Sequence, residues 1–241
     1  MTRTFDYPNA TLGTVTLRVD SRARNVNARW VKGRLRLTVP PSVAASNAGI
    51  DSFLERLMPR ILAMKKMPDY SDMAPIECPG LRFEFSRQTA VPRGVTCLPR
   101  LPMTSIGIGS EIDTGDASAT RAVSRALCSC AHTLAPELLL PRAREIADTL
   151  GVSPTMWRVG RGLKTLGTCD AKGIITLSSA TVFLPQNLRD YIVCHELAHL
   201  LEMNHSSRFH SVCSDYCERA VGAPERALTA SLRAFPWPIL R

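Results

Sequence analysis

The sequence predicts an α+β protein. An N-terminal antiparallel β-rich region, residues 1–118, is followed by a mainly helical domain with a small sheet, residues 119–241. Apolar residues of the first part alternate with period two, as in strands that bury one face. From about Thr120 they recur every three or four positions, which is the period of an amphipathic helix. The chain has 241 residues, of which 45% are hydrophobic, and this is enough for one large core or two smaller ones.

The N-terminal region is expected to contain three strands in a meander, followed by a helix and further β structure. The pair Pro40-Pro41 ends the first run of strands, and Pro59 is expected to kink or shorten the helix. The expected elements are strands at Val15–Val19, Val26–Trp30 and Leu35–Val39, a helix from Ile50 to Ile61, a strand at Leu81–Phe85, and a loop or sheet edge between Pro92 and Pro102.

Helical patterns dominate the second part. Pro136 and Pro141 separate two helical faces, the second of which ends at Gly151. The apolar tail at Phe235–Pro238 is expected to pack on the body of the protein. The elements expected between these features are strands at Met156–Val159 and Gly173–Leu177, a helix from Asn187 to Met203 and another from Ser207 to Val221.

The run His195-Glu196-Leu197-Ala198-His199 is the most informative stretch of the chain. Two histidines four positions apart lie on one face of a helix, so their side chains can bind one metal ion. Glu196 is offset by one position, which keeps it out of the ligand set but near enough to act as a general base toward a water molecule. Three of the five histidines fall within eleven positions, which disfavours ordinary buried helix residues as an explanation.

His205 is expected to supply the third ligand, provided that the helix ends before it. In a continuous helix it would be turned roughly 80° from His195 and lie three turns further along. Asn204 is the candidate end point, because Asn tolerates the left-handed conformation. Catalytic zinc usually has three protein ligands and a water whose pKa falls to about 7. The sequence therefore predicts a zinc hydrolase with ligands His195, His199 and His205, and with Glu196 as the catalytic base.

Composition narrows the cellular setting. No apolar leader follows Met1, and no apolar run approaches the roughly twenty residues that span a bilayer, so a cytoplasmic protein is expected. The eight cysteines are expected to be reduced thiols. The pairs Cys128/Cys130 and Cys213/Cys217 leave open a second, thiolate-bound zinc, although they lack the customary two-residue gap.

The net charge of +9 comes mainly from the N-terminal part. Residues 1–100 hold 16 Lys and Arg against 8 Asp and Glu, whereas the remainder holds 14 against 13. The favoured interpretation is a solvated sheet face; the alternative is a contact with nucleic acid, a nucleotide or an acidic protein surface, although few aromatic residues for base stacking lie nearby. This basic strip consists of Arg18, Arg22, Arg24, Arg29, Lys32, Arg34 and Arg36.

The order of these segments resembles that of the YgjP-like family of metallopeptidases over most of the chain. The most specific resemblance lies in Asp190–His199, then Asn204-His205-Ser206, and Phe209. It implies a zincin-like (minimal metallopeptidase) fold for the second domain. It also implies that His195, His199 and His205 bind zinc and that Glu196 is catalytic, with Phe209 as a following anchor.

The segment Lys164–Cys169 departs from the family pattern. Where the family typically has Arg-x-Trp-Gly-Ser-Cys, this chain keeps Gly167 and Cys169 but has Leu166 and Thr168 in place of Trp and Ser. Because the segment would flank the cleft, a changed substrate choice or reduced activity is expected. The strand before the metal helix, at Ile174–Ser178, is expected to bind the substrate backbone by edge pairing.

Three functions remain open. The first is a zinc peptidase in which Glu196 activates water and returns the proton to the leaving amine, with His210, Tyr216 or Arg208 as candidates for oxyanion stabilisation. The second is a zinc-dependent nucleotide hydrolase or a nucleic-acid-recruited protease that uses the basic strip. The third is a non-catalytic, metal-stabilised binding module, which an intact Glu196 disfavours. Should His205 not bind the metal, the acidic candidates are Glu218 and Asp215.

Overall fold

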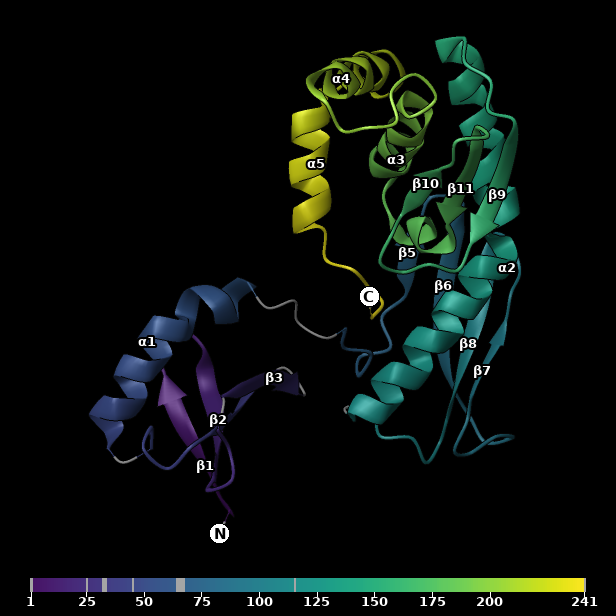
Figure 1. The fold of residues 1–241 in the computed structure, drawn as a ribbon. Helices are drawn as coiled ribbons and strands as arrows, with labels where there is room; N and C mark the ends of the chain where they lie inside the picture. Colours follow the sequence, from purple (N-terminus) through teal and green to yellow (C-terminus); the bar gives the residue numbers. More distant parts are fainter. Residues whose placement is uncertain are drawn as a thin grey trace. The chain divides into compact units, whose positions relative to one another are not determined.

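The computed structural model describes residues 2–24, 26–31, 34–44, 46–63, 68–114 and 116–240. The chain divides into two compact units: Met1–Asp72 with Asp113–Thr120, and Met73–Ile112 with Arg121–Arg241. In the described residues, five α-helices and three small sheets form a mixed α+β protein (Figure 1). The predicted fold class is therefore confirmed.

The first unit is one sheet whose inner face is covered by helix α1 (Asn47–Ala63). Apolar side chains at every second position of the central strands meet Ile50, Phe53 and Leu54 of the helix in one core. The helix continues through Pro59, so this proline does not shorten it as expected. The strands, in their order across the sheet, are β1 (Thr2–Asn9), β2 (Gly13–Asp20), β4 (Arg34–Val39) and β3 (Asn27–Val31).

The expected meander is wrong in its strand order. Strand β2 pairs in parallel with β4, with Leu17 opposite Leu37, and β3 pairs antiparallel with the far side of β4. Strand β1 was not foreseen and pairs antiparallel with β2. Leu17 and Leu37 are fully buried, as are Val15, Leu35 and Val39 at alternate positions, so β2 and β4 occupy the centre of the sheet. The sheet is therefore mixed rather than antiparallel.

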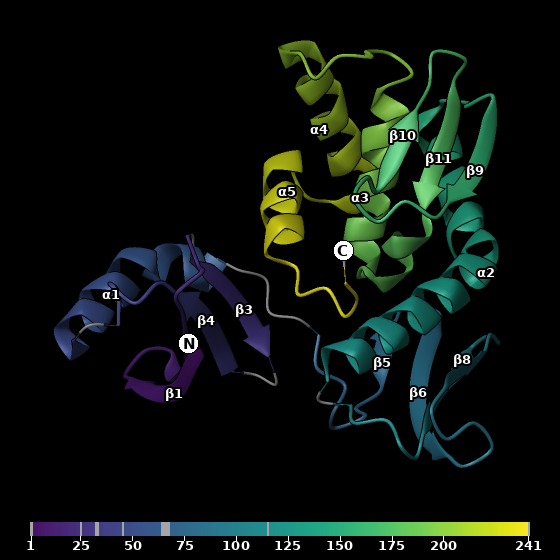
Figure 2. The same ribbon diagram turned by 60° about the horizontal axis from the view of Figure 1, so that its bottom comes forward.

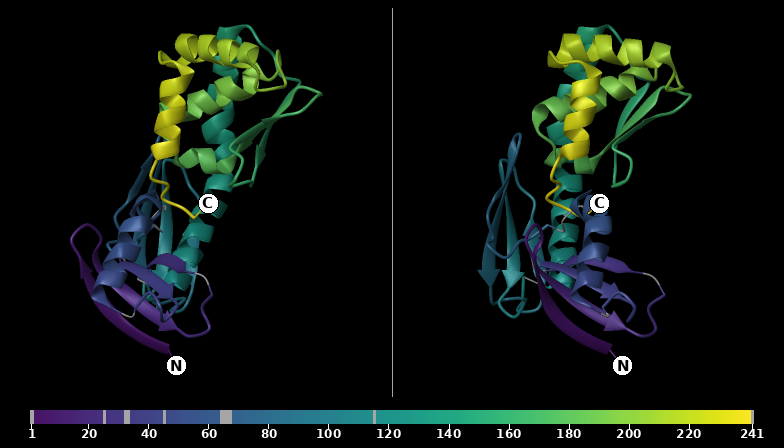
Figure 3. Two further views of the ribbon diagram at one scale, coloured as in Figure 1. Left: turned by 60° about the vertical axis from the view of Figure 1, so that its left-hand side comes forward. Right: turned by 90° about the vertical axis from the view of Figure 1, so that its left-hand side faces the viewer.

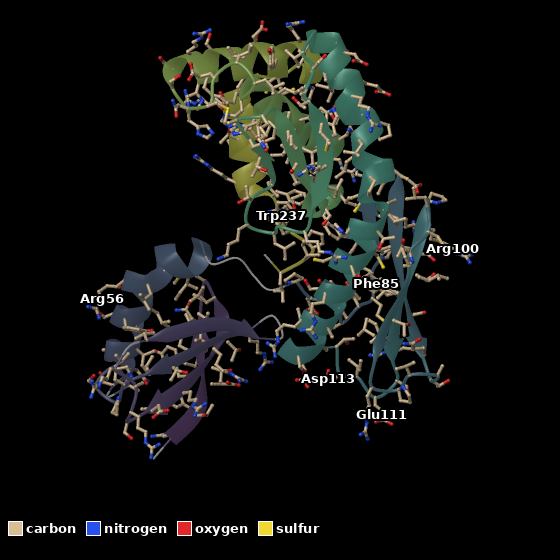
Figure 4. All side chains as sticks on the ribbon, turned by 45° about the vertical axis from the view of Figure 1, so that its right-hand side comes forward. Arg56, Phe85, Arg100, Glu111, Asp113 and Trp237 are labelled. Atoms are coloured by element: carbon tan, nitrogen blue, oxygen red, sulfur yellow. The ribbon has the colours of Figure 1, made fainter. Side chains whose placement is uncertain are left out.

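The second unit begins with a four-stranded sheet, β5-β6-β8-β7, which also contains a parallel pair. Its edge strand β7 lies in the Pro-rich stretch, as expected, and Figure 4 labels Phe85 on β6. The sequence boundary at residue 118 assigned this sheet to the first domain, whereas the structure groups Met73–Ile112 with the second unit. The strands are β5 (Ile76–Cys78), β6 (Leu81–Gln88), β7 (Val95–Leu98) and β8 (Met103–Gly109).

Long-range contacts explain this grouping. The ring of Phe83 on β6 stacks on Phe183 at a centroid distance of 5.5 Å. The buried guanidinium of Arg189 donates a hydrogen bond of 3.0 Å to the carbonyl oxygen of Pro79. Such contacts across about 100 residues cannot be read from local patterns.

Helix α2 (Ala117–Leu150) is continuous through Pro136 and Pro141, so the predicted division into two helical segments is wrong (Figures 1 and 2). Both prolines are exposed, whereas Leu134 and Ile146 of the same helix are buried. Tertiary packing of the buried side chains holds the helix together despite the hydrogen bonds that the prolines remove.

The rest of the second unit combines a three-stranded sheet, β10-β11-β9, with three helices. Figure 3 shows these helices grouped at one end of α2. The last helix, α5, was not foreseen. The elements are β9 (Met156–Gly160), β10 (Gly167–Cys169), β11 (Ile174–Ser178), the short 3-10 helix η1 (Ser179–Phe183), α3 (Gln186–Ala198), α4 (Ser207–Val221) and α5 (Glu225–Ala234).

The C-terminal tail packs on the second unit, as predicted. Trp237, labelled in Figure 4, is only 9% exposed, and its ring meets Phe235 edge to face. The backbone N–H of Leu240 donates to the hydroxyl of Ser124 on α2, at 2.9 Å. None of the helices in the described ranges has the length and hydrophobicity to cross a membrane.

Candidate metal centre

Helix α3, which carries the HExxH run, is fixed by buried polar contacts near its start. The carboxylate of Asp190 accepts hydrogen bonds from Arg142 on α2 at 3.0 Å and from Gln186 at 2.6 Å. The guanidinium of Arg189 donates to the carbonyl oxygens of Leu184 and Val182. These charge-assisted contacts set the position of the helix relative to its neighbours.

The three predicted ligands converge at the end of α3. The Nε2 atoms of His195 and His205 are 3.2 Å apart, and one ring nitrogen from each of His195, His199 and His205 lies within 4.8 Å of the other two. Phe209, which is fully buried, contacts all three rings at centroid distances of 4.5 to 4.9 Å. The expected anchor thus forms the floor beneath the three imidazoles.

The chain turns toward His205 earlier than expected. Helix α3 ends at Ala198, and His199 is its C-cap in a right-handed conformation. Asn204 does not have the expected left-handed conformation. In the described ranges, Met73 is the one non-glycine residue with a positive φ. A hydrogen bond of 3.1 Å between Nδ1 of His199 and the carbonyl oxygen of Glu202 holds the turn instead. The turn needs no residue in a strained conformation.

This arrangement fits a metal ion of zinc's size. Tetrahedral zinc with Zn–N distances of about 2.0–2.1 Å places its ligand nitrogens about 3.3 Å apart, close to the observed 3.2 Å between His195 and His205. The contact between Nδ1 of His199 and Glu202 leaves its Nε2 available as a ligand.

The protonation states also suit metal binding. Burial and the neighbouring His199 and His205 lower the pKa of His195 to about 4. Burial also lowers the pKa of His199. Both rings are therefore neutral near pH 7, which is the form in which imidazole binds a metal.

Glu196 is a buried carboxyl group in contact with strand β10. It is 5% exposed, and burial raises its pKa to about 7. A Cβ atom at Gly167 would lie 2.5 Å from the Oε1 of Glu196. Glycine is therefore required at this position by the close approach of the carboxylate, and the Gly167 expected from the family pattern has a direct physical role.

The sequence did not single out Glu225. Its carboxylate accepts a hydrogen bond from Nδ1 of His210 at 3.0 Å, and it lies with the thiol of Cys213 within 4.8 Å of a ring nitrogen of His195. The Nδ1 of His195 is buried and has no hydrogen-bond partner. Glu225 is in the first turn of α5, so finding it from the sequence would have required predicting that helix and its packing.

Asp215 and Glu218, the alternative candidates for a third metal ligand, lie outside the histidine cluster. Asp215 pairs with Arg219 at 3.3 Å, Glu218 is exposed, and neither joins a metal-ligand cluster among the described residues. The three residues considered for oxyanion stabilisation have different surroundings. His210 is bound to Glu225, Tyr216 is buried in α4, and Arg208 is exposed.

All eight cysteines are free thiols, as expected. Cys194 and Cys213 each contact Cys217 in the core between α3 and α4, and these hydrogen bonds together with burial raise the pKa of both. In the described residues, the pairs Cys128/Cys130 and Cys213/Cys217 do not form a separate three-ligand cluster. The structure therefore lends no support to a second, thiolate-bound zinc.

The free sheet edge beside Glu196 belongs to β10, not β11. The expected strand, β11, is central and pairs antiparallel with β10 and parallel with β9. The alternation of apolar residues in β11 correctly predicted that strand, but the sequence of the short β10 is typical of a loop. The backbone N–H of Ser178 donates to the carbonyl oxygen of Leu166, and the backbone N–H of Asp170 donates to the carbonyl oxygen of Ile174. In an antiparallel ladder, residues whose backbone groups face the partner strand alternate with residues whose groups face away. The N–H and C=O groups of residues 167 and 169 therefore face away from β11.

The basic strip is partly neutralised within its own sheet. Arg34 pairs with Asp6 at 3.6 Å, and Arg18 pairs with Asp20 at 3.8 Å. Arg18 and Arg36 are exposed at alternate positions to the buried leucines, as expected for an outer sheet face. Lys32 and the side chain of Arg29 lie outside the described residues.

Comparisons with known proteins identify the family of the chain. The model of the YgjP-like metallopeptidase domain matches residues 24–226. Among solved structures, the metallopeptidase zymogen abylysin of Pyrococcus abyssi is 28% identical over 39% of this chain and 96% of that chain, with a TM-score of 0.32, too low to carry a structural argument. No curated protein shows significant similarity to the chain. Because the family model covers most of its length, the chain belongs to the YgjP-like family of metallopeptidases.

Proposed function

We propose that this protein is a zinc-dependent peptidase in which His195, His199 and His205 bind the metal and Glu196 is the catalytic base. One observation carries the proposal: three imidazole nitrogens converge within 4.8 Å of one another, next to a buried carboxyl group. A purely structural site would have no use for that carboxyl group.

A zinc ion bound there would supply Lewis-acid chemistry, polarising the scissile carbonyl and making water more acidic. Glu196 takes the proton from the attacking water and delivers it to the leaving amine. Its pKa of about 7 suits both steps, because a base near the working pH can accept and release a proton. Burial of Glu196 also keeps bulk water from competing for the same proton.

The substrate backbone adds to the free edge of β10. The outward N–H and C=O groups of Gly167 and Cys169 pair with an extended peptide, as in other strand-addition complexes. Gly167 also contacts Glu196, so this pairing brings the bound peptide to the catalytic carboxylate. The exposed Thr168, which replaces the usual Ser, points to the opposite face of the strand.

The test compares three purified full-length proteins. Glu196→Gln should bind zinc with wild-type stoichiometry and cleave unfolded protein substrates at least 1,000-fold more slowly. His205→Ala should lose tight zinc binding, and Glu218→Gln, an exposed acid outside the cluster, should match the wild type. Full peptidase activity of Glu196→Gln would refute the assigned base.

The competing functions predict other outcomes. A binding module would retain zinc but cleave no peptide, and Glu196→Gln would leave its properties unchanged. The family is one of peptidases, which favours protein or peptide substrates and lends no support to nucleotide hydrolysis or recruitment by nucleic acid.

A further inference from the structure

A cationic pocket lies beside the loop that leads into β10. It has a volume of about 460 Å³, and its wall includes the guanidinium-bearing side chains of Arg121 and Arg125 on α2 and Arg161 after β9. The buried Ser124 and Ser179 and the exposed Ser129 also line the wall. The lining contains no acidic residue.

None of the three arginines has a carboxylate partner in the described part of the chain. Other arginines of the second unit either pair with Asp or Glu, as Arg82 and Arg142 do, or, like Arg144, have no such partner among the described residues but do not line this pocket. Three arginines without carboxylate partners on the wall of one pocket give it a net positive charge, which an anionic ligand neutralises. The pocket therefore has the chemistry of a carboxylate or phosphate site.

The position of the pocket connects it with the proposed peptide site. Arg161 is six residues before Gly167, which contacts Glu196, and six residues span at most about 20 Å. Two hydrogen bonds from Ser178 fix the segment between Arg161 and Gly167. The hydroxyl of Ser178 donates to the carbonyl oxygen of Gly162, and its backbone N–H donates to the carbonyl oxygen of Leu166. An extended substrate advances about 3.3 Å per residue. A side chain of the substrate no more than about six residues from the scissile bond can therefore reach the pocket.

We propose that the pocket lined by Arg121, Arg125 and Arg161 is a specificity subsite for acidic side chains of the peptide substrate. It selects substrates with Asp or Glu on one side of the scissile bond. This inference rests on the proposed peptidase function and names its substrate class.

The experiment uses a peptide that the wild type cleaves, with a single Glu or Gln placed in turn at each of the six positions on either side of the bond. At one or more positions on one side, Glu should lower KM about fivefold relative to Gln at low salt. The advantage should shrink at 0.5 M salt and disappear in the double variant Arg125→Gln/Arg161→Gln. Arg144→Gln, an exposed arginine further along the same helix, is the matched control and should keep it.

A second measurement does not depend on turnover. In a Glu196→Gln background, fluorescence anisotropy should show tighter binding of the Glu peptide than of the Gln peptide, and the double pocket variant should abolish the difference. Equal KM for Glu and Gln at every position, or a preference that survives in the double variant, would overturn the proposal. If ATP binds the wild type and not the double variant while the two peptides behave alike, the pocket is a phosphate site and the proposal is wrong. Failure of the wild type to cleave any peptide would instead refute the proposed function.

Discussion

At the scale of single residues, the site depends on two close approaches that the motif alone does not specify. Glu196 lies against a glycine on a neighbouring strand, and a ring nitrogen of His195 lies within 4.8 Å of Cys213 and Glu225. The first approach limits the positions of the proposed base, and the second concerns the surroundings of a proposed metal ligand. Each yields a substitution with a matched control.

Gly167→Ala should disable the base without emptying the metal site. The new Cβ would lie 2.5 Å from Oε1 and 2.7 Å from Cδ of Glu196, so the carboxylate must rotate away. Displacement of a catalytic group by about 1 Å costs about 100-fold in rate, so kcat should fall by at least that factor while zinc stoichiometry stays at the wild-type value. Gly162→Ala is the control, because the nearest atom to its Cβ would be 3.6 Å away. Wild-type kcat for Gly167→Ala would contradict the assigned contact.

Glu225→Gln should weaken metal binding. A carboxylate behind a metal-binding imidazole stabilises the proton on its second nitrogen and raises its basicity, and loss of such a partner typically costs 10- to 100-fold in affinity. The amide keeps the shape of Glu225 but removes the charge. Competition with a chelator would measure the zinc dissociation constant, with Glu202→Gln as control, since only the backbone carbonyl of Glu202 contacts a ligand. Equal dissociation constants for wild type and Glu225→Gln would show that Glu225 serves His210 alone.

At the scale of elements, the three residues of strand β10 differ in where their backbone groups point. Residue 168 pairs with β11, whereas residues 167 and 169 face outward. Proline removes a backbone N–H, so its effect should depend on which side of the strand that N–H faces.

Cys169→Pro should raise KM for peptide substrates by about fivefold to tenfold, because one outward donor is lost, with little change in Tm. Thr168→Pro should lower Tm instead, because it removes a donor that pairs with β11. Cys169→Ala, which keeps the N–H, should behave as the wild type. Steady-state kinetics and thermal unfolding of the three variants distinguish these outcomes. An unchanged KM in Cys169→Pro would exclude substrate pairing at this edge.

The elements show which features local patterns can predict. The bounds of α4 agree with the sequence, because its apolar spacing, the Ser206 cap and the left-handed Gly222 are all local signals. Pairing partners are not local: β2 skips β3 to join β4, and the short β10 provides the free edge. The end of α3 at Ala198 depends on the turn held by the hydrogen bond between His199 and Glu202, and no single residue of the sequence predicts this turn.

The same division holds for the site. The three histidines and Glu196 could be named from their spacing, because an i, i+4 pair on a helix constrains geometry strongly. Glu225 and the contact of Gly167 with Glu196 could not, because they depend on how α5 and β10 pack against α3. Tertiary contacts thus decide the surroundings of a motif whose core is local.

At the scale of the whole molecule, each compact unit has its own hydrophobic core. The sheet and helix α1 of the first unit enclose Leu17, Leu37 and Leu54, all fully buried. The three proposed metal ligands all belong to the second unit. Charge is also divided, since the basic strip lies in the first unit and the arginine-lined pocket in the second.

Zinc should therefore stabilise the protein unevenly. A ligand that binds only the folded state contributes about 2.7 kcal/mol at 100 times its dissociation constant, and this stabilisation should appear in the unit that holds the ligands. Hydrogen exchange of the full chain, with zinc and after chelation, should show slower exchange with zinc in α3, the turn at 199–206 and α4. The central strands β2 and β4 should exchange equally in both conditions, because their core contains no metal ligand. His205→Ala should abolish the difference between the two conditions, so a zinc effect that persists in this variant, or one that extends equally to β2 and β4, would place the metal elsewhere in the chain.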